Sequence, residues 1–237
     1  MKPFRFASAV ALLAFAVSPA RAQLDSRDLA ALQGITSQLP GRSSDELKSS
    51  SPLLSERMHE HGVPAVSITY FQDGQIRWAR AFGEVKAGSR VPADVSTLFQ
   101  AASLSKTVTA AGALQAIDRG QLSLDENLAK WLKRWNIAFP AGRGPVTLRQ
   151  LLSHTGGASV SGYPGYAAGE PVPTLAQSLA GVPPAITPPV AIVAAPGGQF
   201  SYSGGGYSIV QRLLDQTLQG AFKQGIAKGV LRPAGMI

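Results

Sequence analysis

One short segment constrains the fold of this chain more than any other. Residues 65–71 and 76–82 are both rich in β-branched and aromatic side chains, and Asp73-Gly74 lies between them. An Asp-Gly pair between two such runs is typical of a β-hairpin. Two strands alone form a sheet of marginal stability. We therefore expect the hairpin either to lie on helices or to belong to a sheet whose other strands this sequence lacks.

After residue 103 the apolar residues recur at helical spacing. They are Val108, Ala111, Leu114 and Ile117. This spacing predicts one buried helical face, and Gly120 is placed to end the helix in a left-handed conformation.

Other segments also carry helical patterns. Helices are predicted over 25–38, over 53–61, from Ser123 or Asp125 through Trp131, over 146–154, over 207–218, and in a last short stretch toward Leu231. Residues 156–200 are crowded with Gly, Pro and Ala, which predicts an irregular surface excursion.

The first 22 residues have the three parts of a secretory signal peptide. Lys2 and Arg5 form a positive end, residues 7–17 are apolar, and residues 20–22 read Ala-Arg-Ala. The apolar stretch is shorter than the roughly 20 residues that span a bilayer, although a retained membrane anchor is the alternative. We expect cleavage near Ala22 and a periplasmic or secreted protein, with one domain over 23–237.

Composition excludes several kinds of chemistry. The chain has no cysteine, so disulfides, thiolate metal sites and a cysteine nucleophile are excluded. The net charge is +8, but Lys2, Arg5 and Arg21 belong to the predicted signal peptide, and the other basic residues are scattered singly. This pattern indicates a mildly basic surface and not a nucleic-acid partner.

Residues 103–106 read Ser-Leu-Ser-Lys, an S-x-x-K tetrad at the start of the predicted helix. Three residues are nearly one helical turn, so Ser103 and Lys106 share a face. A serine needs a neighbour that accepts its proton, and a partly desolvated lysine can do so. The helix N-terminus adds partial positive charge where an oxyanion would form. Alone, the tetrad would indicate a helix-capping serine beside a solvated lysine.

Other segments give the tetrad its context. Residues 97–99 read TLF, residues 120–125 read GQLSLD, residues 151–157 read LLSHTGG, and residues 200–207 read FSYSGGGY. In this order, from about residue 53 to 237, the chain resembles the serine β-lactamase and penicillin-binding-protein family. It is most similar to the class C-like branch, which also contains esterases and D-aminopeptidases. The resemblance implies an α+β fold of two subdomains, with an antiparallel sheet flanked by helices and a mostly helical part.

The resemblance also assigns roles to residues. Ser103 matches the acylated nucleophile, Lys106 its activating lysine, and Tyr202 the tyrosine of the family's Y-x-N motif, a general base or proton shuttle. Neighbouring positive charge would favour the phenolate of Tyr202. The alternative for Tyr202 is a buried aromatic residue with a satisfied hydroxyl.

Two departures from the family pattern affect the interpretation. Gly204 stands where the motif has Asn, so a substrate can be bound there only by backbone groups, which favours an ester over a β-lactam amide. The family's third motif, K-T-G or H-x-G, would follow beyond Ile237. We therefore expect an incomplete member that lacks the C-terminal strands of the sheet.

Other chemistries are less well supported. No G-x-S-x-G pentad occurs, and residues 59–61 (His-Glu-His) do not have the spacing of a helical metal site. His154 is predicted to be structural, as a hydrogen-bond partner at a helix end. Gly204-Gly205-Gly206 indicates a flexible turn and not a phosphate cradle, and Trp131 with Trp135 indicates a half-buried amphipathic helix and not a ligand or membrane surface.

The sequence as a whole predicts an exported serine hydrolase that forms an acyl-enzyme on Ser103 with an ester or amide. The substrate would be a β-lactam, a D-amino-acid peptide or a small ester, and no cofactor is needed. The alternative is a catalytically inactive fragment, or a binding or receptor module of the same fold that can be acylated.

Overall fold

The computed structural model describes residues 54–139, 142 and 144–236. The predicted signal peptide and the predicted helix over 25–38 lie outside the described residues. The described residues up to Gln100 belong to one compact unit, and those from Ala101 onward belong to a second one.

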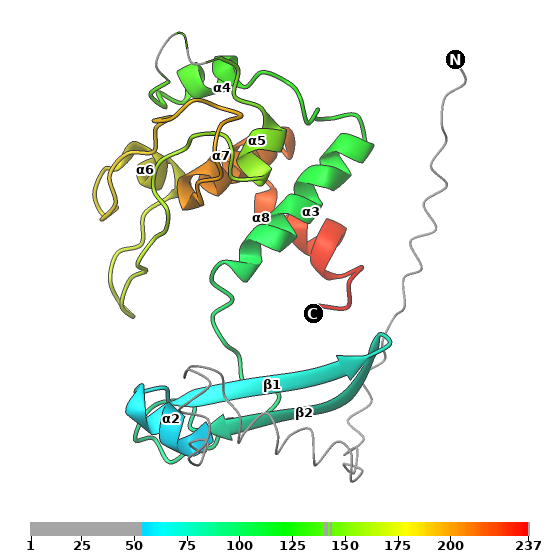
Figure 1. The fold of residues 1–237 in the computed structure, drawn as a ribbon, viewed down its shortest axis with the longest axis vertical. Coiled ribbons are helices and arrows are strands. Elements are labelled where there is room, and N and C mark those ends of the chain that lie inside the picture. Colours follow the sequence, from blue (N-terminus) through cyan, green and yellow to red (C-terminus); the bar gives the residue numbers. More distant parts are fainter. Residues whose placement is uncertain (1–53, 140–141, 143, 237) are drawn as a thin grey trace, which may run out of the picture. The chain divides into compact units, whose positions relative to one another are not determined.

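The first unit consists of a short helix and the predicted hairpin (Figure 1). Helix α2 (Leu54–Glu60) is followed by strands β1 (Ala65–Gln72) and β2 (Gln75–Gly83), which pair antiparallel. The turn residues Asp73 and Gly74 both have positive φ, at 51° and 73°. Two-residue hairpin turns of the primed type require this conformation, and Asp and Gly supply it. The predicted hairpin is confirmed.

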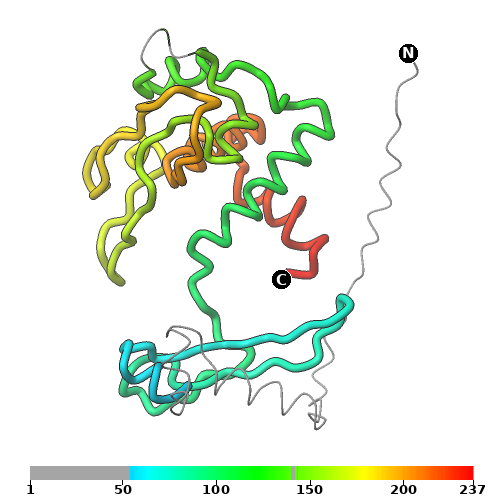
Figure 2. Tube along the Cα trace, in the orientation of Figure 1, coloured from blue at the N-terminus to red at the C-terminus, as the bar shows by residue number. Residues whose placement is uncertain are grey.

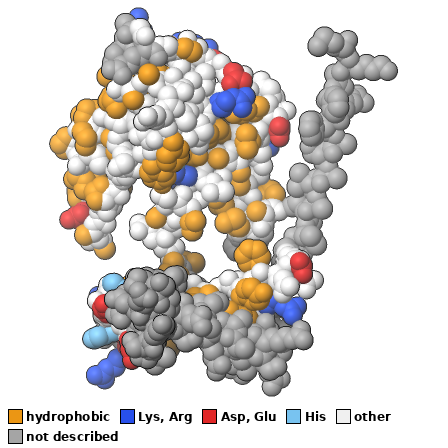
Figure 3. Space-filling model, in the orientation of Figure 1, with side chains coloured by type: hydrophobic (Ala, Val, Ile, Leu, Met, Phe, Trp, Pro, Cys, Tyr) orange, Lys and Arg blue, Asp and Glu red, His pale blue; other side chains and the backbone are white. Residues whose placement is uncertain are grey.

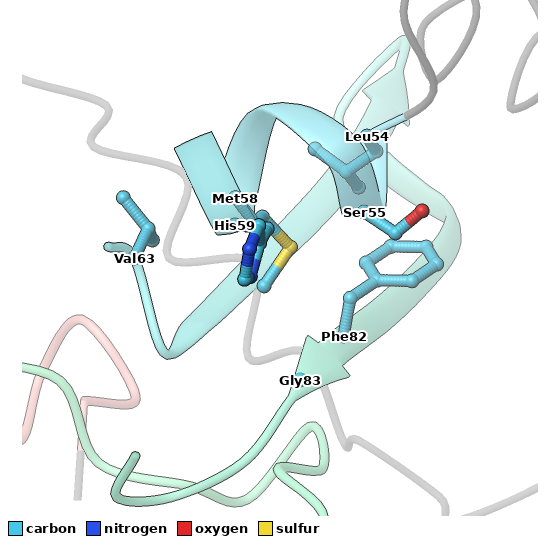
Figure 4. A pocket seen from close by; sticks show the side chains of 7 residues that line it. All are labelled: Leu54, Ser55, Met58, His59, Val63, Phe82 and Gly83. Carbon is cyan, nitrogen blue, oxygen red and sulfur yellow. The ribbon is translucent and has the colours of Figure 1, made fainter. Parts of the chain in front are cut away.

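The buried apolar side chains among the described residues of this unit come from α2, β2 and the segment after β2: Leu54, Met58, Trp78 and Ala93. Trp78 of β2 is only 2% exposed. An apolar hollow lies between α2 and the end of β2 (Figure 4); it is lined by Leu54, Ser55, Met58, His59, Val63, Phe82 and Gly83. None of the predicted catalytic residues belongs to this hollow.

The second unit is helical. Its elements are α3 (Leu104–Asp118), α4 (Ala129–Arg134), α5 (Leu148–Leu152), α6 (Leu175–Ala180), α7 (Gly204–Thr217), α8 (Phe222–Ile226) and the π-helical turn η2 (Ala227–Leu231). Helix α7 is central, because α3, α5, α6 and α8 all contact it (Figure 1). With the hairpin of the first unit, these helices make an α+β fold.

The core of the second unit forms around one apolar face of α7. Ile209, Val210, Leu213 and Leu214 are at most 1% exposed. They pack with buried side chains of the other helices and of the connections, among them Leu128, Leu132, Val146, Leu148, Leu151, Leu179, Val190 and Ile192. Each buried aliphatic side chain of this size contributes roughly 1.5–3 kcal/mol.

Helix α3 is confirmed, with Gly120 beyond its end at a φ of 69°. Its predicted buried face is wrong in part. Leu114 is 48% exposed, and the fully buried residues are Ala113 and Ala116. Ala113 and Ala116 belong to the core cluster around α7, whereas Leu114 lies outside it.

Two other predictions are corrected by side-chain hydrogen bonds. The helix expected from Ser123 or Asp125 begins only at Ala129, whose N–H is accepted by Asn127 Oδ1. The Asp125 carboxylate instead makes a bidentate pair with Arg149 of α5, at 2.7 and 2.8 Å. Helix α7 begins three residues earlier than predicted, at Gly204, since the Ser203 hydroxyl accepts the N–H of Gly206.

The excursion predicted over 156–200 is mostly irregular, as the yellow part of the trace in Figure 2 shows, but it contains α6 (Figure 1). A capping box starts this helix: Thr174 Oγ1 accepts the N–H of Gln177, and Gln177 Oε1 accepts the N–H of Thr174. The T-x-x-Q spacing is a sequence signal for a helix start that the expectation of an irregular segment overlooked.

The surface agrees with a scattered charge. On the face drawn in Figure 3, the Lys and Arg side chains of the described residues are dispersed and form no continuous patch. No helix among the described residues is both long enough and apolar enough to cross a membrane.

Candidate active site

Ser103 lies at the N-terminus of α3. It is the residue before the first helical position, and the preceding Ala102 has a φ of 43°. A left-handed conformation costs an alanine roughly 1–2 kcal/mol. The turn at Ala102 places Ser103 directly before the first residue of α3. The N–H of Ser103 belongs to the N-terminal groups that have no intrahelical partner, and the positive end of the helix dipole lies beside it.

Lys106 follows one turn later in α3. Its Nζ donates a hydrogen bond to Ser103 Oγ at 3.1 Å. The S-x-x-K spacing thus brings the two side chains together, as the helical period predicts. The same ammonium lies over the ring of Tyr202, at 4.8 Å from the ring centroid.

Tyr202 comes from the segment that leads into α7. Its hydroxyl donates to Ser103 Oγ at 2.8 Å, across 99 residues of sequence. The ammonium of Lys106, and after it the hydrogen bond with Ser103, lower the pKa of the Tyr202 phenol below its ordinary value. The side chain is 42% exposed, so it is not the buried aromatic residue of the alternative interpretation.

His154 and Tyr207 lie next to these three residues. The N–H of Ser203, directly before α7, donates to His154 Nδ1 at 3.0 Å. The predicted helix-end hydrogen bond of His154 is confirmed. Burial, and after it the charge of Lys106, lower the pKa of His154. Burial raises the pKa of Tyr207, whose hydroxyl donates to the carbonyl oxygen of Leu152 at 3.0 Å.

Gly204 is the first residue of α7 and is buried. Its N–H donates to the carbonyl oxygen of Ser161 at 3.0 Å, and its own carbonyl oxygen accepts from the Ser208 hydroxyl at 3.2 Å. A Cβ at this position would lie 3.3 Å from the Ser161 oxygen and 3.3 Å from the ring of Tyr163. Its backbone groups therefore have partners within the chain, and the glycine makes room for residues 161–163.

Sequence reasoning missed the part that residues 161–163 play beside the site. The Tyr163 and Ser208 hydroxyls share a hydrogen bond of 2.8 Å, which fixes this segment on α7. No local signal marks it, because the segment lies in the Gly- and Pro-rich excursion. Within the described ranges, no group of three or more His, Cys, Asp or Glu residues could hold a metal ion.

Comparison with known proteins gives this arrangement a family. The family model described as Beta-lactamase matches residues 51–237. The chain is 30% identical over 168 residues to the D-alanyl-D-alanine-carboxypeptidase/endopeptidase AmpH of Escherichia coli K12, covering 69% of this chain and 42% of AmpH. It is 35% identical over 96 residues to Esterase EstB of Burkholderia gladioli, covering 40% of this chain and 24% of EstB.

A solved structure with the same fold is the octameric penicillin-binding protein homologue from Pyrococcus abyssi. The match has a TM-score of 0.64 and 29% identity, and it covers 77% of this chain and 42% of that one. This chain belongs to the Beta-lactamase family, and its fold is the one that β-lactamases share with penicillin-binding proteins. It spans less than half the length of each of these relatives.

Proposed function

We propose that this protein is an exported serine hydrolase that forms an acyl-enzyme on Ser103 with an ester or amide substrate. One observation carries the proposal: the Lys106 ammonium and the Tyr202 hydroxyl converge on Ser103 Oγ, at 3.1 and 2.8 Å. A serine that serves only as a helix cap would need neither contact.

The proposed reaction starts after Tyr202 has lost its proton. The phenolate, which the charge of Lys106 stabilises, then accepts a hydrogen bond from the Ser103 hydroxyl. Ser103 Oγ attacks the carbonyl carbon while its proton passes to the Tyr202 oxygen. Tyr202 then gives this proton to the leaving alkoxide or amine as the bond to the leaving group breaks. In deacylation, water attacks the acyl carbon and gives a proton to the Tyr202 phenolate. Tyr202 passes this proton to Ser103 Oγ as the bond between the acyl carbon and Oγ breaks, which releases the carboxylic acid. General acid–base catalysis of this kind contributes about 10²–10⁴-fold.

The oxyanion of each tetrahedral intermediate accepts a hydrogen bond from the Ser103 N–H in this proposal. The N-terminus of α3 supports it, because its dipole favours negative charge there. Lys106 supports it as well, since its ammonium is one turn away.

The proposed substrates follow from the relatives and from Gly204. The relatives are named as a carboxypeptidase/endopeptidase and as an esterase, so peptides that end in D-amino acids, small esters and β-lactams are all candidates. Gly204 has no amide side chain, and its backbone groups bond to Ser161 and Ser208. This favours a small ester. Export is proposed from the signal-peptide pattern of residues 1–22.

Intact-mass measurement after incubation with a fluorophosphonate tests the proposal. We expect one adduct on the parent protein and none on Ser103→Ala. Ser105→Ala is the matched control, because it removes the other hydroxyl of the same tetrad, and it should be labelled like the parent. If the parent protein gains no adduct, the chain is not an active serine hydrolase, and the alternative of an inactive module is favoured.

A further inference from the structure

We propose that His154 is a positioning residue that holds Tyr202 against Ser103 by bonding to the backbone on both sides of the tyrosine. This inference rests on the proposed function for its kinetic consequences, but its geometry stands independently. It deepens the prediction from sequence, which gave His154 a structural role only.

The first part of the evidence is a pair of hydrogen bonds. The carbonyl oxygen of His154 accepts the N–H of Ser201 at 2.8 Å, and its Nδ1 accepts the N–H of Ser203 at 3.0 Å. Ser201 and Ser203 are the two chain neighbours of Tyr202. One histidine thus fixes the backbone N–H groups of both neighbours of the tyrosine, which restricts the direction of its side chain.

The second part is ring packing. The His154 and Tyr202 ring centroids are 4.5 Å apart, and Tyr207 lies 5.2 Å from the imidazole on α7. Phe200 contacts the imidazole edge-on, at 5.6 Å. Aromatic rings attract one another at such centroid distances. The imidazole therefore also supports the face of the Tyr202 ring.

The backbone of His154 is itself held in an uncommon conformation. It follows the end of α5 with a φ of 59°. This left-handed conformation is easy for Gly and accessible to Asn, Asp and His, but strained for most other residues. A capping box at Thr147 and Gln150 fixes the other end of this short helix. The residue that supports Tyr202 therefore follows a helix, α5, whose start is fixed by hydrogen bonds.

The protonation state of His154 agrees with this role. Nδ1 accepts a hydrogen bond and so carries no proton, which leaves the neutral tautomer with its proton on Nε2. In the described part of the chain, the titratable groups that face the ring are Lys106 from α3, and Tyr202 and Tyr207 from the α7 side. A protonated imidazole would lose the Ser203 bond and would add a second cation beside Lys106.

Two variants separate positioning from mere stability. His154→Gly and His154→Asn both tolerate the positive φ, but only Asn keeps an acceptor, Oδ1, near the place of Nδ1. The rate of Ser103 acylation by a fluorophosphonate is measured for each variant per folded molecule and as a function of pH. We expect a loss of about a hundredfold for His154→Gly, since a misplacement of 1 Å can cost that much, and recovery of most of it in His154→Asn.

A second readout needs no catalysis. The Tyr202 phenol is titrated by ultraviolet difference absorbance against a Tyr202→Phe partner in each background. Displacing the phenol from Lys106 and Ser103 raises its pKa in His154→Gly, toward the ordinary value of about 10. If the parent protein is not acylated at all, the proposed function fails, while this titration still decides the role of His154.

The inference is overturned if folded His154→Gly reacts at the parent rate with an unchanged pH profile and an unchanged titration of Tyr202. If His154→Gly does not fold, His154→Asn and His154→Gln replace the pair, because their amides differ in position by one methylene. Equal rates for Asn and Gln would then overturn it.

Discussion

Lys106 acts on both other residues of the proposed catalytic group. Its ammonium donates a hydrogen bond to Ser103 and lies over the ring of Tyr202. The lowered pKa of Tyr202 means that its phenolate forms at a lower pH than in a free tyrosine. Acylation by a phenolate base therefore rises with pH through a range below about 10.

Lys106→Ala should shift this rise to higher pH and reduce the acylation rate at neutral pH by about a hundredfold or more. The measurement is a pH–rate profile of fluorophosphonate labelling. Lys106→Arg is the matched control, because it keeps the positive charge and most of the lowering of the Tyr202 pKa. The planar guanidinium differs in shape from the compact ammonium, so the acylation rate should still fall. An unchanged profile in Lys106→Ala would mean that Lys106 does not set the pKa of Tyr202.

The three consecutive glycines of α7 differ in the room around them. A Cβ on Gly205 would lie 2.4 Å from the carbonyl oxygen of Ser159, one on Gly204 would lie 3.3 Å from its nearest neighbours, and one on Gly206 would be in ordinary contact at 3.5 Å. We expect Gly205→Ala to destabilise most, Gly204→Ala to be intermediate, and Gly206→Ala to be neutral or stabilising by about 0.4–1 kcal/mol.

Urea denaturation of the three variants checks this order. Acylation of Gly204→Ala should fall as well. The added methyl group would displace residues 161–163, and Gly204 directly follows Ser203, the neighbour of Tyr202. An equal loss of stability in all three variants would contradict the packing seen around them.

At the scale of elements, α5 and α6 offer a matched comparison, since a capping box with the same residue types starts each helix. Thr147→Ala and Thr174→Ala should each cost about 1 kcal/mol in the free energy of unfolding, measured with urea. Only Thr147→Ala should also lower the acylation rate per folded molecule, because α5 leads into His154. If Thr174→Ala slows acylation equally, the connection through α5 is wrong.

The elements that could be predicted from sequence are those fixed by local chemistry. The hairpin follows from Asp73-Gly74, and α3 follows from its apolar spacing. The start of α4 could not be predicted, because Asp125, a good helix-capping residue, pairs instead with Arg149, 24 residues away. The buried face of α3 differs from the prediction because Ala113 and Ala116, and not Leu114, belong to the core around α7.

The same distinction applies to the site. The contact between Ser103 and Lys106 lies within one helical turn, so the spacing alone predicts it. The approach of Tyr202 was expected only through the family resemblance, since 99 residues separate it from Ser103. The sequence predicts a helix-end hydrogen bond for His154, but no local pattern identifies Ser201 and Ser203 as its partners. The packing of Tyr163 beside Gly204 likewise depends on how the excursion folds.

For the whole molecule, the histidine of the site couples stability to pH. The folded-state pKa of His154 lies below its ordinary value of about 6.5. Below about pH 6.5 the unfolded chain therefore binds a proton that the folded chain does not, and the free energy of unfolding falls as the pH falls toward the folded-state pKa. The lowered pKa values of Asp94 and Asp125 act in the same direction, but only below about pH 4.

Urea denaturation of the parent protein between about pH 7.5 and 5.5, followed by far-ultraviolet circular dichroism, should show this loss. His154→Asn is the matched control, because it keeps an acceptor for the Ser203 N–H but cannot be protonated in this range, and every other titratable group is present in both proteins. The parent should lose more stability than the variant as the pH falls. Parallel curves for the two proteins would mean that His154 takes up its proton equally in the folded and unfolded chain. This would contradict an imidazole held neutral by burial and by the charge of Lys106.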